Sequence, residues 1–296
     1  MKKVIFTLVI AFITVISVNA QDLTSKKGFP ILPETGDICL SIDAVPFFVY
    51  AGNFFHGSEQ TSAPNWNFPG FGTLGTNVPM FTISLKKFIN PKTAYRARIR
   101  IGYNIDTKKN VLRDQNDTIS LTNPSTVTDK WSNSQLNIAL GFGLEKRRGK
   151  GRVQGIYGAM ANVMLSSVGN KFTYGNAFSS NFTHPESTVY PWHEISSGVY
   201  ETAYEASRVT TFNEGMTFGV GVNAFVGVEY FFAPKMSIGG EFSWGVIFQV
   251  TGKSKEVAEY WSEGAVKTQE TKVGGSTYFG IDNSNSGGCI NLSFYF

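Results

Sequence analysis

The C-terminal segment is the sequence feature that most constrains the fold. In the last ten residues, alternate positions carry large apolar side chains, namely Ile290, Leu292, Phe294 and Phe296. The positions between them carry Cys289, Asn291, Ser293 and Tyr295. Because successive side chains of a strand point to opposite faces, one face meets an apolar medium and the other a more polar interior. This pattern predicts a β-sheet with one face in lipid.

The first twenty residues have the pattern of a secretory leader. Lys2 and Lys3 precede an apolar run, and Val18-Asn19-Ala20 suits a cleavage site. A retained helical anchor is the alternative, but the run is short for a bilayer span. We therefore expect a signal peptide over residues 1–20 and a short periplasmic segment over residues 21–35. No other apolar stretch is long enough for a spanning helix, so a helical membrane protein is excluded.

Eight segments show the period-2 alternation of strands. They cover approximately residues 36–44, 78–89, 93–103, 134–146, 152–165, 216–231 and 236–250, followed by the C-terminal segment. Three connections are short, near residues 90–92, 147–151 and 232–235. Four connections are long, near residues 45–77, 104–133, 166–215 and 251–285.

This alternation of short and long connections is typical of a membrane barrel with periplasmic turns and extracellular loops, and it places both termini in the periplasm. The sequence therefore predicts an all-β fold, a closed up-and-down antiparallel transmembrane β-barrel over residues 36–296. Eight strands and four long extracellular loops are expected. Ten strands are the alternative, if a hairpin lies within residues 185–212 or near residues 265–280.

The composition agrees with alternating strands. Mean hydropathy is only −0.07 although the chain holds 25 Phe and 12 Tyr, because the two faces of such strands average out. The formal net charge of +4 includes Lys2 and Lys3 of the leader. The mature chain therefore lacks the basic excess that nucleic-acid binding requires.

Charged residues occupy predicted inward positions. Arg96, Arg98 and Arg100 share one face of the third strand. The inward acidic residues are Asp37, Asp43, Glu145, Glu229 and Glu241. Since an unpaired buried charge costs several kcal/mol, we expect these residues to pair across the lumen. An eight-stranded interior is just wide enough for side chains, which favours a salt-bridged plug over an anion-selective pore.

The two cysteines, Cys39 and Cys289, occur at inward positions of the first and last predicted strands. These strands become neighbours when the barrel closes, so a disulfide in the oxidising envelope is one interpretation. Two small buried thiols are the alternative.

The histidines provide weak evidence for catalysis. His184, Glu186 and Ser187 lie close in sequence, with His193 and Glu194 nearby. A Ser/His/acid set requires defined hydrogen-bond geometry, and no nucleophile elbow surrounds the serine. The ligand spacings of zinc and calcium sites are also absent. We predict no enzyme, no metal and no other cofactor.

These features resemble the small outer-membrane β-barrel proteins of the OmpA/OmpX type, and more narrowly those of Bacteroidota. The resemblance covers the mature chain and rests on the leader, the turn and loop asymmetry and the ending Leu292-Ser293-Phe294-Tyr295-Phe296. It implies a Gram-negative outer membrane, contact with its lipids and insertion by the barrel-assembly machinery, with Leu292, Phe294 and Phe296 as the C-terminal signal. Asp117-Thr118-Ile119 is similar to the glycosylation site of exported Bacteroidota proteins.

The long predicted loops are rich in aromatic residues, which are enriched where proteins bind partners. We therefore interpret the chain as a non-enzymatic barrel with a plugged polar interior. Its loops would act in surface interaction or bind an envelope protein as part of a complex. A small porin-like pore or transporter for small or hydrophobic solutes is the alternative. A lipid-modifying enzyme of the outer leaflet is a third hypothesis.

Overall fold

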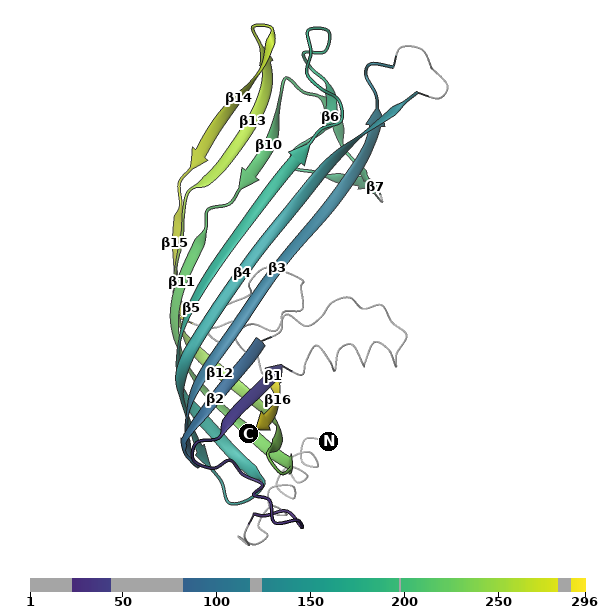
Figure 1. The fold of residues 1–296 in the computed structure, drawn as a ribbon. Helices are drawn as coiled ribbons and strands as arrows, with labels where there is room; N and C mark the ends of the chain where they lie inside the picture. The colour runs from purple at the N-terminus through teal and green to yellow at the C-terminus, as the bar shows by residue number, and fades with distance from the viewer. Residues whose placement is uncertain (1–22, 44–81, 118–123, 197, 282–288) are drawn as a thin grey trace, which may run out of the picture.

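Eight antiparallel strands form a closed ring in the computed structural model of the protein (Figure 1). They are β1 (Ile38–Asp43), β2 (Thr82–Asn90), β3 (Thr93–Arg113), β4 (Thr126–Arg148), β5 (Val153–Thr173), β11 (Thr217–Ala233), β12 (Met236–Thr251) and β16 (Cys289–Tyr295). Each ring strand pairs with the next in this order, and β16 pairs with β1 to close the ring. The all-β, antiparallel character predicted from the sequence is thus confirmed.

The structure describes residues 23–43, 82–117, 124–196, 198–281 and 289–296. The predicted signal peptide and the first predicted long loop lie outside these residues. Within the described ranges, no helix is both long enough and apolar enough to cross a membrane.

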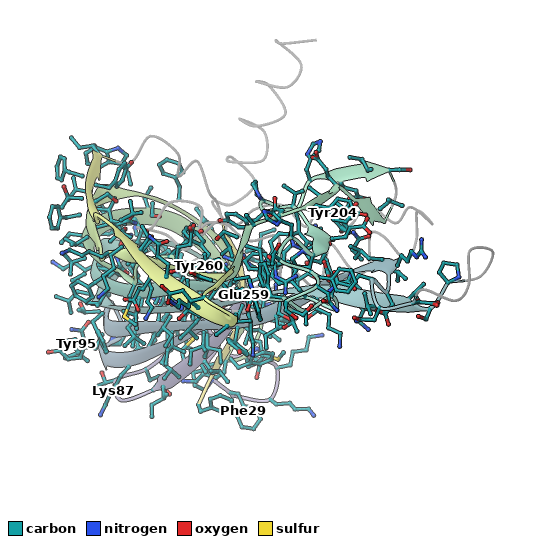
Figure 2. All side chains as sticks on the ribbon, turned by 90° about the horizontal axis from the view of Figure 1, so that it is seen from above. Phe29, Lys87, Tyr95, Tyr204, Glu259 and Tyr260 are labelled. Atoms are coloured by element: carbon teal, nitrogen blue, oxygen red, sulfur yellow. The ribbon has the colours of Figure 1, made fainter. Side chains whose placement is uncertain are left out.

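The two faces of the ring have opposite character. Large apolar side chains are exposed on the outer face, including Leu40, Leu85, Ile99, Phe142, Val163, Val222 and Trp244. Polar and charged side chains are buried on the inner face, including Ser41, Lys86, Arg98, Glu145, Asn162, Asn223, Glu241 and Ser293. At the rim, Lys87 and Tyr95 point away from the ring (Figure 2). The ring therefore buries its polar groups and exposes its apolar ones, as the period-2 alternation predicts.

Strands β3, β4 and β5 are much longer than predicted. They contain 21, 23 and 21 residues, and β3 and β4 stay in register as far as the pair Arg113 and Thr126. The prediction of a loop over residues 104–133 was therefore wrong. Polar residues such as Lys108 and Lys109 occupy both faces there, so the period-2 signal is missing although the backbone is paired.

The sheet continues from these strands into an extended wall on one side of the ring (Figure 1). Strand β10 (Ser207–Asn213) pairs with the end of β5, and β13 (Ser254–Ser262) and β14 (Ala265–Val273) follow it. Strand β15 (Ser276–Ile281) instead pairs with β12. The β13–β14 hairpin lies in a predicted long loop and extends the wall, so it adds no strand to the eight of the described ring.

The third predicted loop is largely folded. Strand β6 (Glu186–Thr188) pairs with β9 (Thr202–Tyr204), and β7 (Glu194–Ser196) pairs with β8 (Val199–Tyr200). We call residues 174–206, apart from residue 197, the insert. The insert contributes to an aromatic cluster with the wall that contains Trp131, Phe172, Tyr174, Tyr190, Trp192, Tyr200, Val209 and Phe212.

The buried carboxylate of Asp129 ties the insert to β4. It accepts hydrogen bonds from the backbone nitrogens of Gly175 and Thr188 and from the Thr188 hydroxyl, each at 2.8 Å. Asn176 adds contacts, because its amide donates to the carbonyls of Arg113 and Glu186. Hydrogen bonds to a carboxylate are stronger than hydrogen bonds to a neutral acceptor. Asp129, which accepts three of them, therefore fixes the insert on the wall.

Glycines allow close approach inside the ring, and Gly158 of β5 is the most restricted of them. A Cβ atom at this position would lie 1.9 Å from the carbonyl oxygen of Leu144 and 2.8 Å from the Phe225 ring. Either the backbone of β4 or the aromatic ring would have to move to admit a methyl group. The small residue is therefore required by packing.

We predict that Gly158→Ala lowers the free energy of unfolding by about 1–3 kcal/mol, the usual cost of overpacking a tight interior. Urea titration of the folded protein in detergent micelles measures this value. The matched control is Gly155→Ala on the same strand, where the nearest atom to the new Cβ is the Arg148 carbonyl oxygen at 3.2 Å. Equal losses for the two variants would contradict the packing argument.

Candidate functional site

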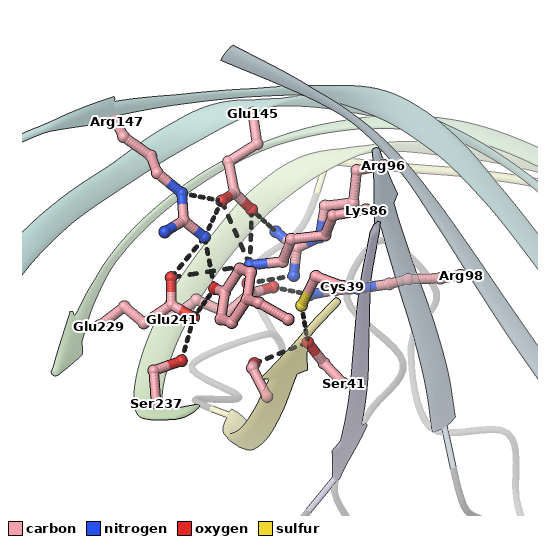
Figure 3. Close-up of polar contacts among 12 residues, drawn as sticks. Cys39, Ser41, Lys86, Arg96, Arg98, Glu145, Arg147, Glu229, Ser237 and Glu241 are labelled. Atoms are coloured by element: carbon pink, nitrogen blue, oxygen red, sulfur yellow. Dashed lines mark hydrogen bonds and ion pairs between the residues drawn. The ribbon is translucent and has the colours of Figure 1, made fainter. Parts of the chain in front are cut away.

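A network of buried charges crosses the interior of the ring (Figure 3). Its acidic members are Glu145 on β4, Glu229 on β11 and Glu241 on β12. Its basic members are Lys86 on β2, Arg96 and Arg98 on β3 and Arg147 on β4. All seven side chains are almost fully buried. Because its members come from five ring strands, the network connects the walls of the ring through its centre.

Glu145 and Glu229 form the part of the network nearest the short turns. Lys86 Nζ lies 3.0 Å from Glu145 Oε2, and Arg147 Nη2 lies 3.1 Å from Glu145 Oε1 and 2.6 Å from Glu229 Oε2. Glu229 also accepts hydrogen bonds from Ser237 Oγ at 2.5 Å and from the Tyr295 hydroxyl. Each of the two carboxylates is therefore paired with at least one cation. Glu229 also has two hydroxyl donors.

Glu241 forms the second part of the network. Its two carboxylate oxygens pair separately with Arg96 and Arg98. Arg96 also reaches Glu145, with 3.5 Å between Nη1 and Oε2, and thereby connects the two parts. The Arg96 guanidinium lies over the Phe225 ring at 4.5 Å from the centroid. Charges removed from water need such partners, because a buried ion pair is favourable only with good geometry and satisfied hydrogen bonds.

An apolar cluster closes the ring at the end that holds the short turns. Phe88, Phe231 and Tyr295 point inward there, and Ile31 of the segment before β1 packs against them. The segment is held by backbone hydrogen bonds, including those between Gly36 N and Phe88 O and between Lys235 N and Ile31 O. The interior thus has an apolar layer beneath its ionic layer.

Arg147 joins the two layers. Its guanidinium carbon lies 4.7 Å from the Phe88 ring centroid, 5.3 Å from that of Tyr295 and 5.7 Å from that of Phe231. The Tyr295 hydroxyl receives a hydrogen bond from Arg147 Nη2 at 2.7 Å. The cation is therefore enclosed by three aromatic rings on one side and two carboxylates on the other, an arrangement that suits a planar guanidinium.

The structure brings together five of the eight residues predicted for the lumen: Arg96, Arg98, Glu145, Glu229 and Glu241. Arg100 is buried on the same face of β3. Asp43 is the last residue of β1, and its side chain lies outside the described part of the chain.

Asp37 was also predicted to face the lumen; the structure shows it half-buried at the short-turn end, paired with Lys235. Strand β1 begins one residue later, at Ile38, so Asp37 is not subject to the alternation of the strand. Its carboxylate accepts a hydrogen bond from Glu34 N at 2.8 Å and pairs with Lys235 at the edge of the ring.

Sequence reasoning missed three members of the network: Lys86, Arg147 and Tyr295. The alternation of the second strand places Lys86 inward, so the signal for it was present. Arg147 was assigned to a turn because the fourth strand was ended at residue 146, whereas β4 continues to Arg148. Tyr295 was recognised as inward, but its contact with a charge depends on the register between distant strands.

Of the two interpretations of the cysteines, the structure shows the thiol for Cys39 and not the disulfide with Cys289. Cys39 is a buried free thiol, and its Sγ lies 3.3 Å from Ser41 Oγ. The register places Cys39 opposite Tyr295 and Cys289 opposite Glu241. The two cysteines are six positions apart along the seam between β1 and β16, or about 20 Å at the usual strand rise, which is far beyond disulfide reach.

The polar residues considered for catalysis are separated by the fold of the insert. Ser187 is fully buried, and its hydroxyl donates to the Pro185 carbonyl at 3.3 Å. His184 Nδ1 instead lies 3.0 Å from Thr183 Oγ1. Among the residues that the structure describes, no group of three or more His, Cys, Asp or Glu side chains could hold a metal ion.

A second polar and aromatic cluster lies where the insert meets the wall. Arg208 of β10 lies over the rings of Tyr174 and Phe178, at 4.3 Å and 4.6 Å from their centroids, and pairs with Glu259 at 2.8 Å. Burial raises the pKa of the Tyr174 hydroxyl, which Arg208 only partly offsets. The hydroxyl therefore stays protonated and donates to the Val209 carbonyl at 2.6 Å.

No protein-family model matches the sequence, and no curated protein matches it either. Among solved structures, the chain is similar to the crystal structure of a major outer membrane protein from Thermus thermophilus. The alignment covers 88% of this chain and 100% of the other, with 12% sequence identity and a TM-score of 0.32. A likeness at this level does not decide the function, which has to be inferred from the geometry of the chain itself.

We predict that Glu145→Gln lowers the free energy of unfolding by about 3–5 kcal/mol, because it leaves Lys86 and Arg147 buried with too little negative charge. Urea titration in detergent micelles measures the loss. The double variant Glu145→Gln/Lys86→Met should recover part of it, since one cation is removed with the anion. Glu270→Gln on the exposed wall, where Lys255 at 2.6 Å and Lys272 at 3.1 Å are the partners, should leave stability nearly unchanged. A Glu145→Gln protein as stable as the wild type would show that the network is not a structural element.

Proposed function

We propose that the chain is an eight-stranded transmembrane β-barrel of a Gram-negative outer membrane. The observation that carries this proposal is the inverted distribution of its side chains. Charged residues fill the interior of the ring, while aliphatic and aromatic residues cover its exterior. In water, such an exterior would be a very large apolar patch, far beyond what soluble monomers expose. In lipid, the same distribution is the favourable one.

The height of the apolar exterior fits a bilayer. On β11, the outward positions from Phe218 to Tyr230 are all apolar or aromatic and exposed. Twelve residues at about 3.3 Å each span roughly 40 Å along the strand, which corresponds to about 28 Å across a membrane at a 45° tilt. Tyr95 and Tyr103 on β3 stand at the two ends of a similar band. Tyrosines in these positions suit the two membrane interfaces.

In this proposal, the end with the short turns and both chain ends faces the periplasm, and the extended wall projects outward. The last strand presents Leu292, Phe294 and Phe296 to lipid, while Ser293 and Tyr295 face the interior. Such an ending suits recognition by the barrel-assembly machinery. Contact with outer-membrane lipids follows directly from the apolar exterior.

The interior supports a closed barrel and not a pore. Seven paired charges and an apolar layer lie inside the ring. An interior of eight strands leaves little space beyond such side chains. A transporter for small solutes would require these ion pairs to separate in a medium of low polarity, which costs several kcal/mol for each ion.

We therefore propose that the protein acts through the part outside the membrane, in surface interaction or as a subunit of an envelope complex. Asp129, Asn176 and the aromatic cluster hold the insert firmly on the wall. A fixed surface loses less conformational entropy on binding than flexible loops do. No catalytic role is proposed.

The membrane placement predicts different effects for two equally exposed valines. Val222 lies on the exterior of the ring, 54% exposed, and Val273 lies on β14 of the wall, 55% exposed. Val222→Arg should destabilise the protein in phospholipid vesicles by about 2–4 kcal/mol, because a cation near the bilayer centre is costly. Val273→Arg should change stability by less than about 0.5 kcal/mol. Urea titration in vesicles measures both, and equal effects would contradict the placement.

The closed interior predicts that the protein conducts no steady current. Purified protein should be inserted in planar bilayers, with insertion shown separately by protease protection of the ring. We expect no reproducible channel, because ions cannot pass the paired charges without breaking them. Stable channels of uniform conductance would favour a pore for small solutes instead.

A further inference from the structure

We propose that the rim of the ring at the short-turn end carries a binding site for an anionic glycerophospholipid, formed by Lys87 on β2, Lys146 and Arg148 on β4 and the tyrosines Tyr95 and Tyr157 on β3 and β5. This inference rests on the proposed membrane placement. Beyond that placement, it specifies the class of lipid that the barrel selects and the strands that bind this lipid.

The three cations lie on the outer face of the ring, where the apolar band ends. All three side chains are exposed, as are Tyr95 and Tyr157. Figure 2 shows Lys87 and Tyr95 projecting from the same edge of the ring. Arg147, between the two β4 cations, points inward and belongs to the buried network. The alternation of β4 therefore separates its basic residues into an interior one and an exterior pair.

The register brings the cations and the tyrosines together. Lys87 lies directly opposite Tyr95, and Lys146 lies directly opposite Tyr157. Residues opposite each other in antiparallel strands have Cβ atoms about 5 Å apart, and diagonal neighbours about 7–8 Å apart. Tyr95 is opposite Leu144, so it is also the diagonal neighbour of Lys146. The five side chains thus form one patch across four adjacent strands.

The described residues of the chain do not balance the charge of this patch. The outward positions of β2 to β5 within the ring carry no acidic residue among those that the structure describes. Glu34 and Asp37, at the same end of the ring, pair with Lys235. More cations follow in the adjacent turns, namely Lys92, Lys150 and Arg152. A surface of this kind fits a ligand that supplies negative charge.

The opposite half of the rim differs. The outward residues there are aromatic or aliphatic, namely Ile38, Tyr230, Phe232, Ile238 and Phe296. A general requirement of the membrane interface would distribute cations around the whole ring. Among the described ring strands and short turns at this end, the cations other than Lys235, which pairs with Glu34 and Asp37, lie on β2–β4 and in the turns beside these strands, which indicates a local site.

Each part of a phospholipid, from the phosphate through the glycerol region to the acyl chains, has matching residues in or below the patch. Lysine and arginine bind phosphate oxygens through charge-assisted hydrogen bonds. Tyrosine suits the interface, where its ring contacts the glycerol region and its hydroxyl contacts water. Below them, the acyl chains would lie along the exposed apolar residues Leu85, Ile99 and Phe142. Because the short-turn end is the proposed periplasmic end, the ligand is a phospholipid of the inner leaflet and not the phosphorylated lipid of the outer leaflet.

The test uses the purified mature protein in a neutral detergent, titrated with palmitoyl-oleoyl phosphatidylglycerol and, separately, with the phosphatidylcholine of the same chains. Native mass spectrometry counts the lipids retained. We expect tighter retention of phosphatidylglycerol. The triple variant Lys87→Gln/Lys146→Gln/Arg148→Gln should lose roughly 100-fold in affinity for it, at roughly fivefold for each cation near an anionic lipid.

The matched control removes three exposed cations far from the rim, in Lys109→Gln/Lys130→Gln/Lys253→Gln, and should retain wild-type affinity. Equal losses in both variants, or equal retention of the two phospholipids by the wild type, would overturn the site. Charge-dependent retention of lipid A in place of phosphatidylglycerol would overturn the choice of leaflet. Insertion into phosphatidylcholine vesicles is measured in parallel. Failure to insert would refute the membrane proposal, whereas insertion without lipid preference would refute only the lipid site.

Discussion

The structure depends on the pairing of charges in the centre of the ring. A carboxylate removed from water is strongly destabilising unless cations and donors replace the lost hydration. Glu145 meets this requirement through Lys86, Arg96 and Arg147, which come from β2, β3 and β4. A change in the relative position of these strands would separate at least one of these cations from the carboxylate. The ionic contacts therefore specify which side chains meet inside the ring, in addition to any stability they provide.

The exterior of the ring reinforces the same arrangement. Since side chains alternate with a period of two, a shift of one residue in any strand would exchange its inner and outer faces. For β3, such a shift would bring Arg96 and Arg98 to the exterior and Ile99 to the interior. Such a shift is unfavourable on both faces, because it would place charged side chains in the apolar exterior and apolar side chains among the charges of the interior. A shift by two residues leaves every side chain on its own face, so the specific contacts inside the ring have to select among the registers that remain.

The parts that could be predicted from the sequence follow from this alternation. The sequence was sufficient for the ring strands, their short turns and most of the inner charges, because the polarity of each residue indicates which face of the strand it occupies. The upper half of the β3–β4 hairpin was missed because residues 104–113 are polar on both faces, so pairing leaves no periodic signal there. The choice between a disulfide and a thiol at Cys39 stayed open because parity does not give register, and register depends on strands that are far apart in sequence. The contacts of Asp129 could not be predicted for the same reason, because its partners are far away in sequence.

The asymmetry of the molecule connects its two proposed surfaces. Strands β3, β4 and β5 extend from the ring into the wall at one end, and at the other end the cations and tyrosines of the rim lie on β2 to β5. A wall on one side of the ring adds mass above only part of the circumference. In the proposed placement, the long β3–β4 hairpin connects the rim at the short-turn end to the exposed insert, because its hydrogen-bonded ladder is continuous from Thr93 to Arg113.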